Sequence, residues 1–300
     1  MTIRCGYVAL IGAPNAGKST LLNAVAGNAF SIVSAKPQTT RGRVRAVVCE
    51  GESQIIFVDT PGIFEAKPAF EKAMVEAAWA GVGEADAILL LVDASRGIDA
   101  DVRRIIEMLG KRGRKAMLVL NKVDKVEKQL LPELAKALYA LFDFERSFMI
   151  SASRGDGIHD IVRLLAGRMP AAPWLYPEDE PTDTPERTLA SEITREQCFL
   201  KLHAELPYGV MVETEKWEEK EVKGKRVLRI NQVIVTEREG HKKIILGKGG
   251  AMLKSIGSVA RRNIGKTLDA EVHLFLFVKV REAWKDDPQS FSAAGLEYKK

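Results

Sequence analysis

The stretch Gly12-Ala13-Pro14-Asn15-Ala16-Gly17-Lys18-Ser19-Thr20 matches the pattern Gly-x-x-x-x-Gly-Lys-Ser/Thr of a phosphate-binding loop. An apolar run at 7–11 precedes it, as expected of a buried strand, and a helical pattern at 21–25 follows it. In this context the glycines turn backbone N–H groups toward a phosphate, and the helix N-terminus adds its positive end. Lys18 is expected to reach the β- and γ-phosphates, and the Ser19 hydroxyl to bind Mg²⁺. The predicted phosphate-binding residues are Gly12, Asn15, Ala16, Gly17, Lys18, Ser19 and Thr20.

Length and composition favour about two globular domains. The chain has 300 residues, 46% of them hydrophobic, which suffices for two cores. No apolar run approaches the roughly 20 residues needed to span a bilayer, and no signal peptide is expected at the N-terminus. Cys5, Cys49 and Cys198 lack metal-ligand spacing and fit a reducing cytosol. We therefore expect a cytoplasmic protein.

Short apolar runs alternate with helical stretches from residue 1 to about 168. Strands are expected at 6–11, 45–49, 54–58, 87–92, 116–120 and 147–150, and helices at 18–27, 69–82, 99–112, 129–142 and 158–167. This alternation predicts a mostly parallel sheet with helices on both faces, so residues 1–170 are assigned to an α/β P-loop domain. Its ligand-binding loops should gather at the carboxyl ends of the strands.

The composition changes sharply after this domain. Residues 170–185 contain five prolines and no Lys or Arg. Proline at this density disfavours helix and strand alike, so residues 171–185 are predicted to be an acidic linker. Residues 186–284 then show helix, two strands, two helices and a strand, the pattern of an α+β domain, and 285–300 are expected to form a C-terminal tail.

Two further segments are predicted to contact Mg²⁺ and the γ-phosphate. Asp59-Thr60-Pro61-Gly62 follows an apolar strand, so Asp59 is expected to hold Mg²⁺ through water and the Gly62 amide to donate to the γ-phosphate. Within Gln38-Thr39-Thr40-Arg41, a threonine should close over both groups. We favour Thr40, and Thr39 stays an alternative. The predicted Mg²⁺ ligands are Ser19, Thr40 and Asp59, and the predicted catalytic residues are Asn15, Lys18, Thr40 and Gly62.

Asn121-Lys122-Val123-Asp124 predicts specificity for guanine. The Asp124 carboxylate could accept two hydrogen bonds from guanine, whereas adenine has no amine at the matching position. Losing two such bonds, at ~1.5–3 kcal/mol each, implies a preference for GTP of at least roughly hundreds-fold. Asn121 is expected to tie this loop to the phosphate loop, with the Lys122 stem along the base. Ser151-Ala152 follows the next strand, and its Ala152 amide is expected to donate to guanine O6.

The position after Gly62 carries Ile63, where Ras-like GTPases have a glutamine that orients water. Because isoleucine neither donates nor accepts a hydrogen bond, backbone, a bound cation or a partner must place the water. We therefore predict slow intrinsic turnover.

The second domain carries a Gly-x-x-Gly turn, Gly247-Lys248-Gly249-Gly250, between two helical segments. A KH domain clamps single-stranded RNA with such a turn. Residues 238–266 hold eight Lys or Arg and one Glu, which favours a polyanionic partner. The apolar residues expected to form the groove floor are Ile234, Val235, Leu253, Ile256, Ala260 and Ile264. The predicted RNA-binding residues are Lys242, Lys243, Gly247, Lys248, Gly249, Gly250, Lys254 and Arg261.

The order of these motifs resembles the Era family of bacterial GTPases over nearly the full length. The matching segments include Pro37-Gln38-Thr39-Thr40-Arg41, Ala190-Ser191-Glu192-Ile193, Glu205-Leu206-Pro207-Tyr208 and Val278-Lys279-Val280-Arg281. The resemblance implies a GTP/GDP switch with Mg²⁺ and a type II KH domain. It also implies binding to the 3′ end of small-subunit ribosomal RNA during assembly of the small ribosomal subunit.

Three further expectations accompany this resemblance. Asn15 is expected to help hold K⁺ near the phosphates, as in related GTPases that lack the glutamine, or only to shape the loop. Peripheral association with the inner face of the cell membrane is implied by the family, and nothing in the sequence demands more than a monomer. The alternative function is a GTPase whose basic C-terminal domain binds protein or membrane instead of RNA.

Overall fold

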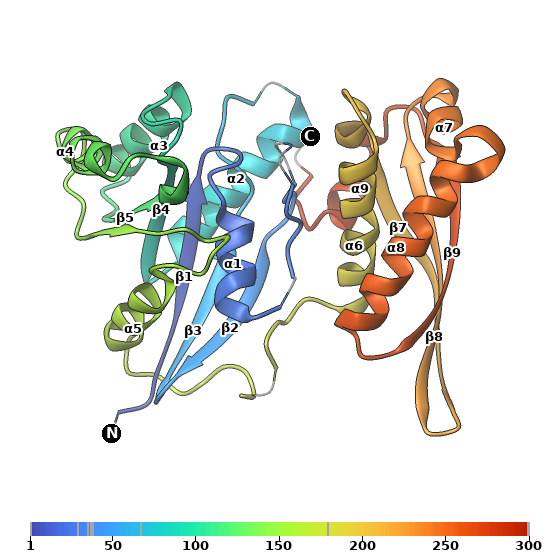
Figure 1. The fold of residues 1–300 in the computed structure, drawn as a ribbon, viewed down its shortest axis with the longest axis horizontal. Coiled ribbons are helices and arrows are strands. Elements are labelled where there is room, and N and C mark those ends of the chain that lie inside the picture. Colours follow the sequence, from blue (N-terminus) through green and yellow to red (C-terminus); the bar gives the residue numbers. More distant parts are fainter. Residues whose placement is uncertain are drawn as a thin grey trace. The chain divides into compact units, whose positions relative to one another are not determined.

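The computed structural model describes residues 2–28, 30–34, 36, 39–66, 68–178 and 180–298. They form two compact units, each with its own sheet (Figure 1). Unit 1 comprises Met1–Ser31, Thr40–Asp183 and Gly295–Lys300, and unit 2 comprises Ile32–Thr39 and Thr184–Ala294.

Unit 1 contains a six-stranded sheet with the order β2-β3-β1-β4-β5-β6. Only the β2–β3 pair is antiparallel; the other neighbours are parallel. The predicted mostly parallel sheet is therefore confirmed. The strands are β1 (Arg4–Gly12), β2 (Val44–Glu50), β3 (Ser53–Asp59), β4 (Ala87–Asp93), β5 (Met117–Asn121) and β6 (Ser147–Met149).

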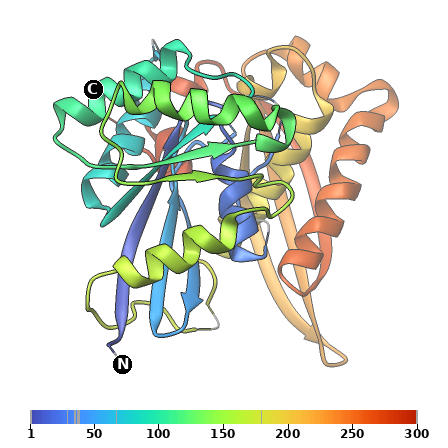
Figure 2. The same ribbon diagram turned by 60° about the vertical axis from the view of Figure 1, so that its left-hand side comes forward.

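Helices cover both faces of this sheet (Figure 2). They are α1 (Lys18–Ala26), α2 (Ala69–Glu84), α3 (Ala100–Lys111), α4 (Leu131–Tyr139) and α5 (Ile158–Arg168). The helices α1 and α5 contact each other on one face, while α2, α3 and α4 share one apolar cluster on the other. In α3, Val102, Ile105 and Leu109 recur at helical spacing and are buried, and the Asp99 carboxylate caps the helix by accepting from Val102 N at 2.9 Å.

The proline-rich segment after α5 lies against unit 1 as far as Asp183. The buried Gln54 side chain on β3 accepts from Leu175 N (2.9 Å) and Tyr176 N (3.1 Å) and donates to Tyr176 O (2.8 Å). Trp174 and Tyr176 also pack beside a small apolar cluster on the sheet. The Gln54 amide and two aromatic rings thus hold a segment whose prolines exclude it from a helix, and the longer part of unit 2 begins at Thr184.

Unit 2 contains a three-stranded sheet with the order β7-β8-β9. Strand β8 pairs antiparallel with β7 and parallel with β9. The helices α6 and α8 contact each other and the sheet (Figure 1). This arrangement confirms the predicted α+β domain. Its elements are α6 (Glu186–Lys201), β7 (Met211–Val222), β8 (Lys225–Thr236), α7 (Glu239–Leu246), α8 (Ala251–Thr267) and β9 (Glu271–Val280).

The segment expected to be a C-terminal tail contains a further helix, α9 (Pro288–Ala293). Phe291 within it is buried, as is Trp284 just before it, and Trp284 Nε1 donates to Gly209 O at 3.2 Å. The chain therefore stays packed on unit 2 as far as Ala294. Among the residues described, no helix is both long and apolar enough to cross a membrane.

Candidate nucleotide and RNA sites

The phosphate loop joins β1 to α1 at the carboxyl edge of the sheet. Gly17 has φ 98°, and a Cβ added there would lie 2.1 Å from the Asn121 side-chain nitrogen, so only glycine fits. Lys18 Nζ donates to Gly12 O and Ala13 O, both at 3.2 Å. Burial lowers the pKa of Lys18 to about 8. The charged form of an ammonium desolvated in this way is strongly stabilised by an anion beside it.

Three hydroxyl groups converge on one carboxylate oxygen at the end of β3. Asp59 Oδ2 accepts from Ser19 Oγ (2.6 Å), Ser31 Oγ (2.7 Å) and Thr40 Oγ1 (3.0 Å). Asp59 is fully buried, and burial raises the pKa of its carboxyl. Its Oδ1 is buried and has no hydrogen-bond partner among the described residues. A cluster of hard oxygen ligands with one unsatisfied carboxylate oxygen fits Mg²⁺.

The predicted Mg²⁺ ligands Ser19, Thr40 and Asp59 therefore lie together, with Ser31 as an addition that sequence reasoning missed. Asn23 on α1 fixes Ser31, because its Oδ1 accepts from Ser31 N at 2.9 Å and its Nδ2 donates to Ser31 O at 2.8 Å. No motif spacing identifies Ser31, since its position depends on this local pair of bonds.

Thr39 and Thr40 have different surroundings. The Thr40 hydroxyl lies in the Asp59 cluster, also 2.9 Å from Ser19 Oγ. The Thr39 carbonyl accepts from Arg195 Nη2 on α6. The boundary between the two units falls between these two residues. Pro37 and Gln38 of the same predicted segment lie outside the described residues.

The segment that follows Asp59 approaches the phosphate loop closely. A Cβ added at Gly62 would lie 3.1 Å from Pro14 Cα, and Ile63 N donates to Gly12 O at 3.1 Å. The Ile63 side chain is buried in the apolar cluster beneath α2 and α3. It therefore cannot face an attacking water.

Asn121 links the phosphate loop to both predicted guanine loops. Its Nδ2 donates to Ala16 O at 2.8 Å, and its Oδ1 accepts from Lys122 N (2.8 Å) and Ala152 N (3.0 Å). The Ala152 amide, expected to donate to guanine O6, is thus bonded to Asn121 in this structure. Ser151 beside it is fully buried.

Lys122 and Asp124 complete this region. Lys122 Nζ donates to Asn15 O (2.7 Å) and to Asp93 Oδ2 (2.6 Å), so its stem runs from the guanine loop to the phosphate loop. Sequence reasoning missed Asp93, although it directly follows the apolar run at 87–92 and ends β4. A hydrogen bond from Ser151 lowers the pKa of the Asp124 carboxyl, which keeps it ionised.

The Gly-x-x-Gly turn of unit 2 joins α7 to α8. Gly247 has φ 72°, and a Cβ added there would lie 2.8 Å from Met252 N, so glycine is required. Gly249 and Gly250 also have positive φ but face open space. The exposed basic side chains near the turn are Lys243, Lys248, Lys254 and Arg261, while Lys242 is half-buried and lies 3.6 Å from Glu239.

Most of the residues expected to form the floor of the RNA groove lie in the core of unit 2 instead. Ile234, Val235, Ile256, Ala260 and Ile264 are completely buried, because α8 packs directly on the sheet. They therefore cannot contact RNA, and this prediction is wrong for these five residues. Sequence reasoning missed Ile244 of α7, which is 53% exposed. His241, which the sequence allows to touch a phosphate, has its Nδ1 buried without a hydrogen-bond partner among the described residues.

Family models match both units. A model described as a 50S ribosome-binding GTPase matches residues 7–122, and a KH-domain model matches residues 205–285. The chain is 52% identical over 297 residues to GTPase Era of Rhizobium meliloti, covering 99% of this chain and 94% of that protein. It is 50% identical over 295 residues to GTPase Era of Brucella suis, covering 98% and 94%.

Two solved structures resemble this one over almost the whole chain. Era of Aquifex aeolicus bound to GDP and AlF4⁻ gives a TM-score of 0.92 at 35% identity, covering 98% of this chain and 99% of that chain. Era in complex with MgGDPNP and nucleotides 1506–1542 of 16S ribosomal RNA gives 0.92 at 36% identity, with the same coverage.

Proposed function

Because this chain belongs to the Era family of GTPases, we propose that its GTP cycle controls binding to the 3′ end of small-subunit ribosomal RNA during assembly of the small ribosomal subunit. The observation that carries the proposal is the Gly-x-x-Gly turn of unit 2, with Lys248 exposed at its tip and a basic helix behind it. A polynucleotide backbone can approach such a turn closely, because nothing lies within 4 Å of a Cβ added at Gly249 or Gly250.

Each part of the nucleotide site has its own role in this proposal. Backbone N–H groups of the phosphate loop and the Lys18 ammonium bind and orient the phosphates, and the Gly62 amide donates to the γ-phosphate. Asp124 selects guanine. Ser19, Thr40 and Asp59 hold Mg²⁺, which when bound neutralises charge on the β- and γ-oxygens. With Ile63 buried, no side chain at that position orients water, so intrinsic hydrolysis is slow.

Asn15 is proposed to hold K⁺ beside the phosphates. It has φ 65° in the phosphate loop, and its carbonyl accepts from Lys122. This fixed left-handed conformation at a non-glycine residue is costly enough to require support from its surroundings. A second cation at this position would compensate for the missing glutamine by placing positive charge near the developing negative charge.

Coupling between nucleotide and RNA is proposed to run through the 32–39 segment. Thr40 belongs to unit 1 and senses Mg²⁺ and the γ-phosphate, while Thr39 belongs to unit 2 and is bonded to Arg195 of α6. In unit 2, Lys36 Nζ also donates to Leu202 O at 2.5 Å, where α6 has just ended. A movement of Thr40 on GTP hydrolysis would therefore pull on a segment that α6 holds at two points.

The test is binding of a fluorescent single-stranded oligonucleotide matching the 3′ end of small-subunit ribosomal RNA. Gly249→Asp adds a negative charge at a position with open space, and Gly224→Asp is the matched control. Gly224 has a similar positive φ, 72°, and equally open space, but it lies in the β7–β8 turn. We expect a GTP analogue to favour binding over GDP, and only Gly249→Asp to abolish it.

Two other results would reject the RNA assignment. If Gly249→Asp binds the oligonucleotide as tightly as Gly224→Asp does, the Gly-x-x-Gly turn is not the RNA-binding site. No binding with either nucleotide, while hydrolysis is intact, would favour the alternative in which unit 2 binds protein or membrane. A monomeric state and a cytoplasmic location with peripheral membrane association belong to the same proposal. Sedimentation of the protein alone measures its oligomeric state, and co-sedimentation with anionic vesicles measures its membrane association.

A further inference from the structure

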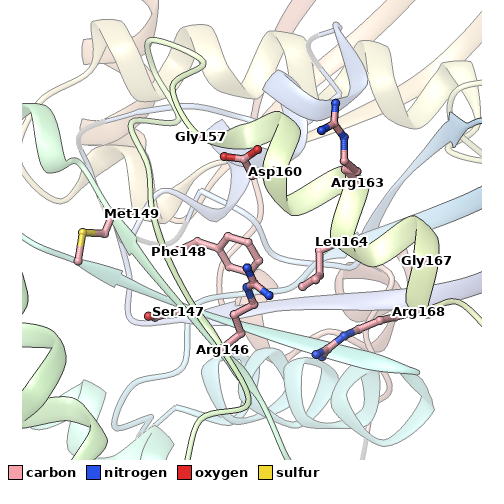
Figure 3. A pocket seen from close by; sticks show the side chains of 10 residues that line it. All are labelled: Arg146, Ser147, Phe148, Met149, Gly157, Asp160, Arg163, Leu164, Gly167 and Arg168. Atoms are coloured by element: carbon pink, nitrogen blue, oxygen red, sulfur yellow. The ribbon is translucent and has the colours of Figure 1, made fainter.

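A groove on unit 1 lies between the edge strand β6 and the helix α5 (Figure 3). It encloses about 720 Å³ and is separate from the phosphate-loop and Asp59 clusters. It begins at Gly157, which precedes α5, and follows Asp160, Leu164 and Gly167 at helical spacing along the helix. Because Gly167 has no side chain and nothing lies within 4 Å of a Cβ added there, the helix presents little bulk at this end of the groove.

The opposite wall of the groove is a strand with one unused side. Strand β6 is the last in the sheet order and pairs only with β5 among the strands of the described residues. In a parallel pair, alternate residues direct their backbone groups to the neighbour. Leu118 lies opposite Ser147, and its N–H donates to Arg146 O at 2.8 Å. The backbone groups of Ser147 and the N–H of Met149 therefore point away from β5, while Met149 O faces Gly157, where an added Cβ would lie 2.8 Å from it.

The side chains around the groove are apolar within and cationic at the rim. Figure 3 shows Phe148 with Arg146 beside its ring and Leu164 facing them from α5; the Arg146 guanidinium carbon is 6.0 Å from the ring centroid. Met149 is 44% exposed. The rim also carries Arg163 and Arg168, against a single lining carboxylate, Asp160.

The pairing of these arginines leaves positive charge available. Arg168 lies 3.3 Å from Glu145, and Arg163 contacts the His159 ring at 2.8 Å. Within the part of the chain that the structure describes, neither Arg146 nor Arg163 forms an ion pair with a carboxylate. The groove therefore complements a ligand that carries negative charge along its length.

We propose that this groove binds an extended, acidic segment of a protein partner as an added strand beside β6. An open strand edge facing a helix offers main-chain hydrogen bonds on one side and side-chain contacts on the other, as in β-strand addition. From Ile158 to Arg168 the helix rises about 15 Å, which matches about four or five extended residues. Apolar residues of the segment contact Phe148 and Leu164, and its acidic residues reach the arginine rim.

A nucleic acid fits these features less well. Arg146 already covers one side of the Phe148 ring, which would compete with base stacking. The open C=O groups of β6 would also remain unused by a phosphate backbone, since phosphates can accept from the N–H groups of the strand but cannot donate to its carbonyls. The strand edge is thus explained by a peptide and not by RNA.

The test measures binding of a fluorescein-labelled hexapeptide of alternating Glu and Val to the full chain. Gly167→Leu fills the groove without backbone strain, because nothing lies within 4 Å of a Cβ added there, and Gly110→Leu on α3 is the matched control. Arg146→Glu reverses a rim charge, with exposed Arg103→Glu on α3 as its control. We expect at least about fivefold weaker binding for each groove variant, and an unchanged affinity for each control.

Backbone methylation of the peptide distinguishes strand addition from simple charge attraction. Two peptides are made, one N-methylated at odd and the other at even positions. Only one pattern removes the N–H groups directed at β6, so one peptide should lose binding and the other should keep it.

Three results would overturn the proposal. They are equal affinity of the two methylated peptides, unchanged binding in Gly167→Leu, and no saturable binding below about 1 mM. A labelled single-stranded oligouridine whose affinity falls in Gly167→Leu and Arg146→Glu, but not in their controls, would likewise reject the peptide and identify this face as an RNA contact.

Discussion

Replacing Asn121 by alanine should weaken nucleotide binding by disconnecting three loops at once. Asn121 is 2% exposed and makes three hydrogen bonds to backbone groups, at Ala16, Lys122 and Ala152. These groups belong to the phosphate loop and to the two predicted guanine loops. After the substitution, one carbonyl and two N–H groups in a nearly water-free region lose their partner.

The expected loss follows from these three bonds. A buried hydrogen bond contributes about 1 kcal/mol net, so the variant should lose about 3 kcal/mol in the opening free energy of unit 1. If the whole loss also appears in binding, the GDP affinity falls about 100-fold. If the loops partly relax after the substitution, the GDP affinity still falls at least about tenfold. The opening free energy is measured by amide hydrogen exchange in β4 and β5, and the affinity with a fluorescent GDP analogue.

Gln54→Ala is the matched control, because Gln54 is also a buried amide with three bonds to backbone groups. Its partners are Leu175 and Tyr176 in the proline-rich segment, away from the phosphate loop. We expect a similar loss of stability but a GDP affinity within about twofold of the parent. If Asn121→Ala binds GDP as tightly as Gln54→Ala does, Asn121 is only structural and the reasoning is refuted.

Three other predictions concern single positions. Ile63→Ala should destabilise unit 1 by about 2–5 kcal/mol, because it leaves a cavity in the core. It should leave the rate of single-turnover phosphate release per folded molecule unchanged. Rapid GTP hydrolysis in the parent that disappears in the variant would contradict this. Hydrolysis should be faster in K⁺ than in Na⁺, and Asn15→Ala should remove the difference, whereas equal rates in the parent would reject the K⁺ site. Burial raises the pKa of the Cys198 thiol to about 12, so at pH 8 only about one molecule in 10⁴ carries the thiolate. Alkylation of Cys198 in the folded protein should therefore be roughly 10³-fold slower than in urea, and its rate should rise tenfold per pH unit. Alkylation of the folded protein at the rate seen in urea would disprove this burial.

Local patterns in the sequence predicted the sheet and the grouping of the candidate nucleotide-site residues. Most strands of unit 1 contain an apolar run, and the phosphate loop, the Asp59 segment and both predicted guanine loops follow such runs, so parallel pairing brings these loops together. Ser19 and Asp59 illustrate this, because their motifs follow β1 and β3 and their side chains meet at 2.6 Å. Thr40 follows no strand, and its motif alone predicted that it joins them, at 3.0 Å from Asp59.

Features that depend on tertiary packing could not be predicted. Ser31 reaches Asp59 because Asn23 holds it, and no periodicity encodes that bond. The attachment of the proline-rich segment depends on Gln54, which contacts Tyr176 across 122 positions of sequence. The sequence also could not show that Ile234 lies beneath α8, because an apolar residue in a strand fits a core and a ligand groove equally well.

The most direct test of the central claim is a thermodynamic cycle between nucleotide and RNA. The affinity of a GTP analogue is measured with and without the oligonucleotide matching the 3′ end of small-subunit ribosomal RNA, and the RNA affinity is measured with the GTP analogue, with GDP and without nucleotide. If the chain is a GTP-controlled RNA-binding switch, RNA tightens binding of the GTP analogue by the same factor by which the analogue tightens RNA binding, and GDP does not reproduce it. Equal RNA affinity in all three nucleotide states would contradict the account.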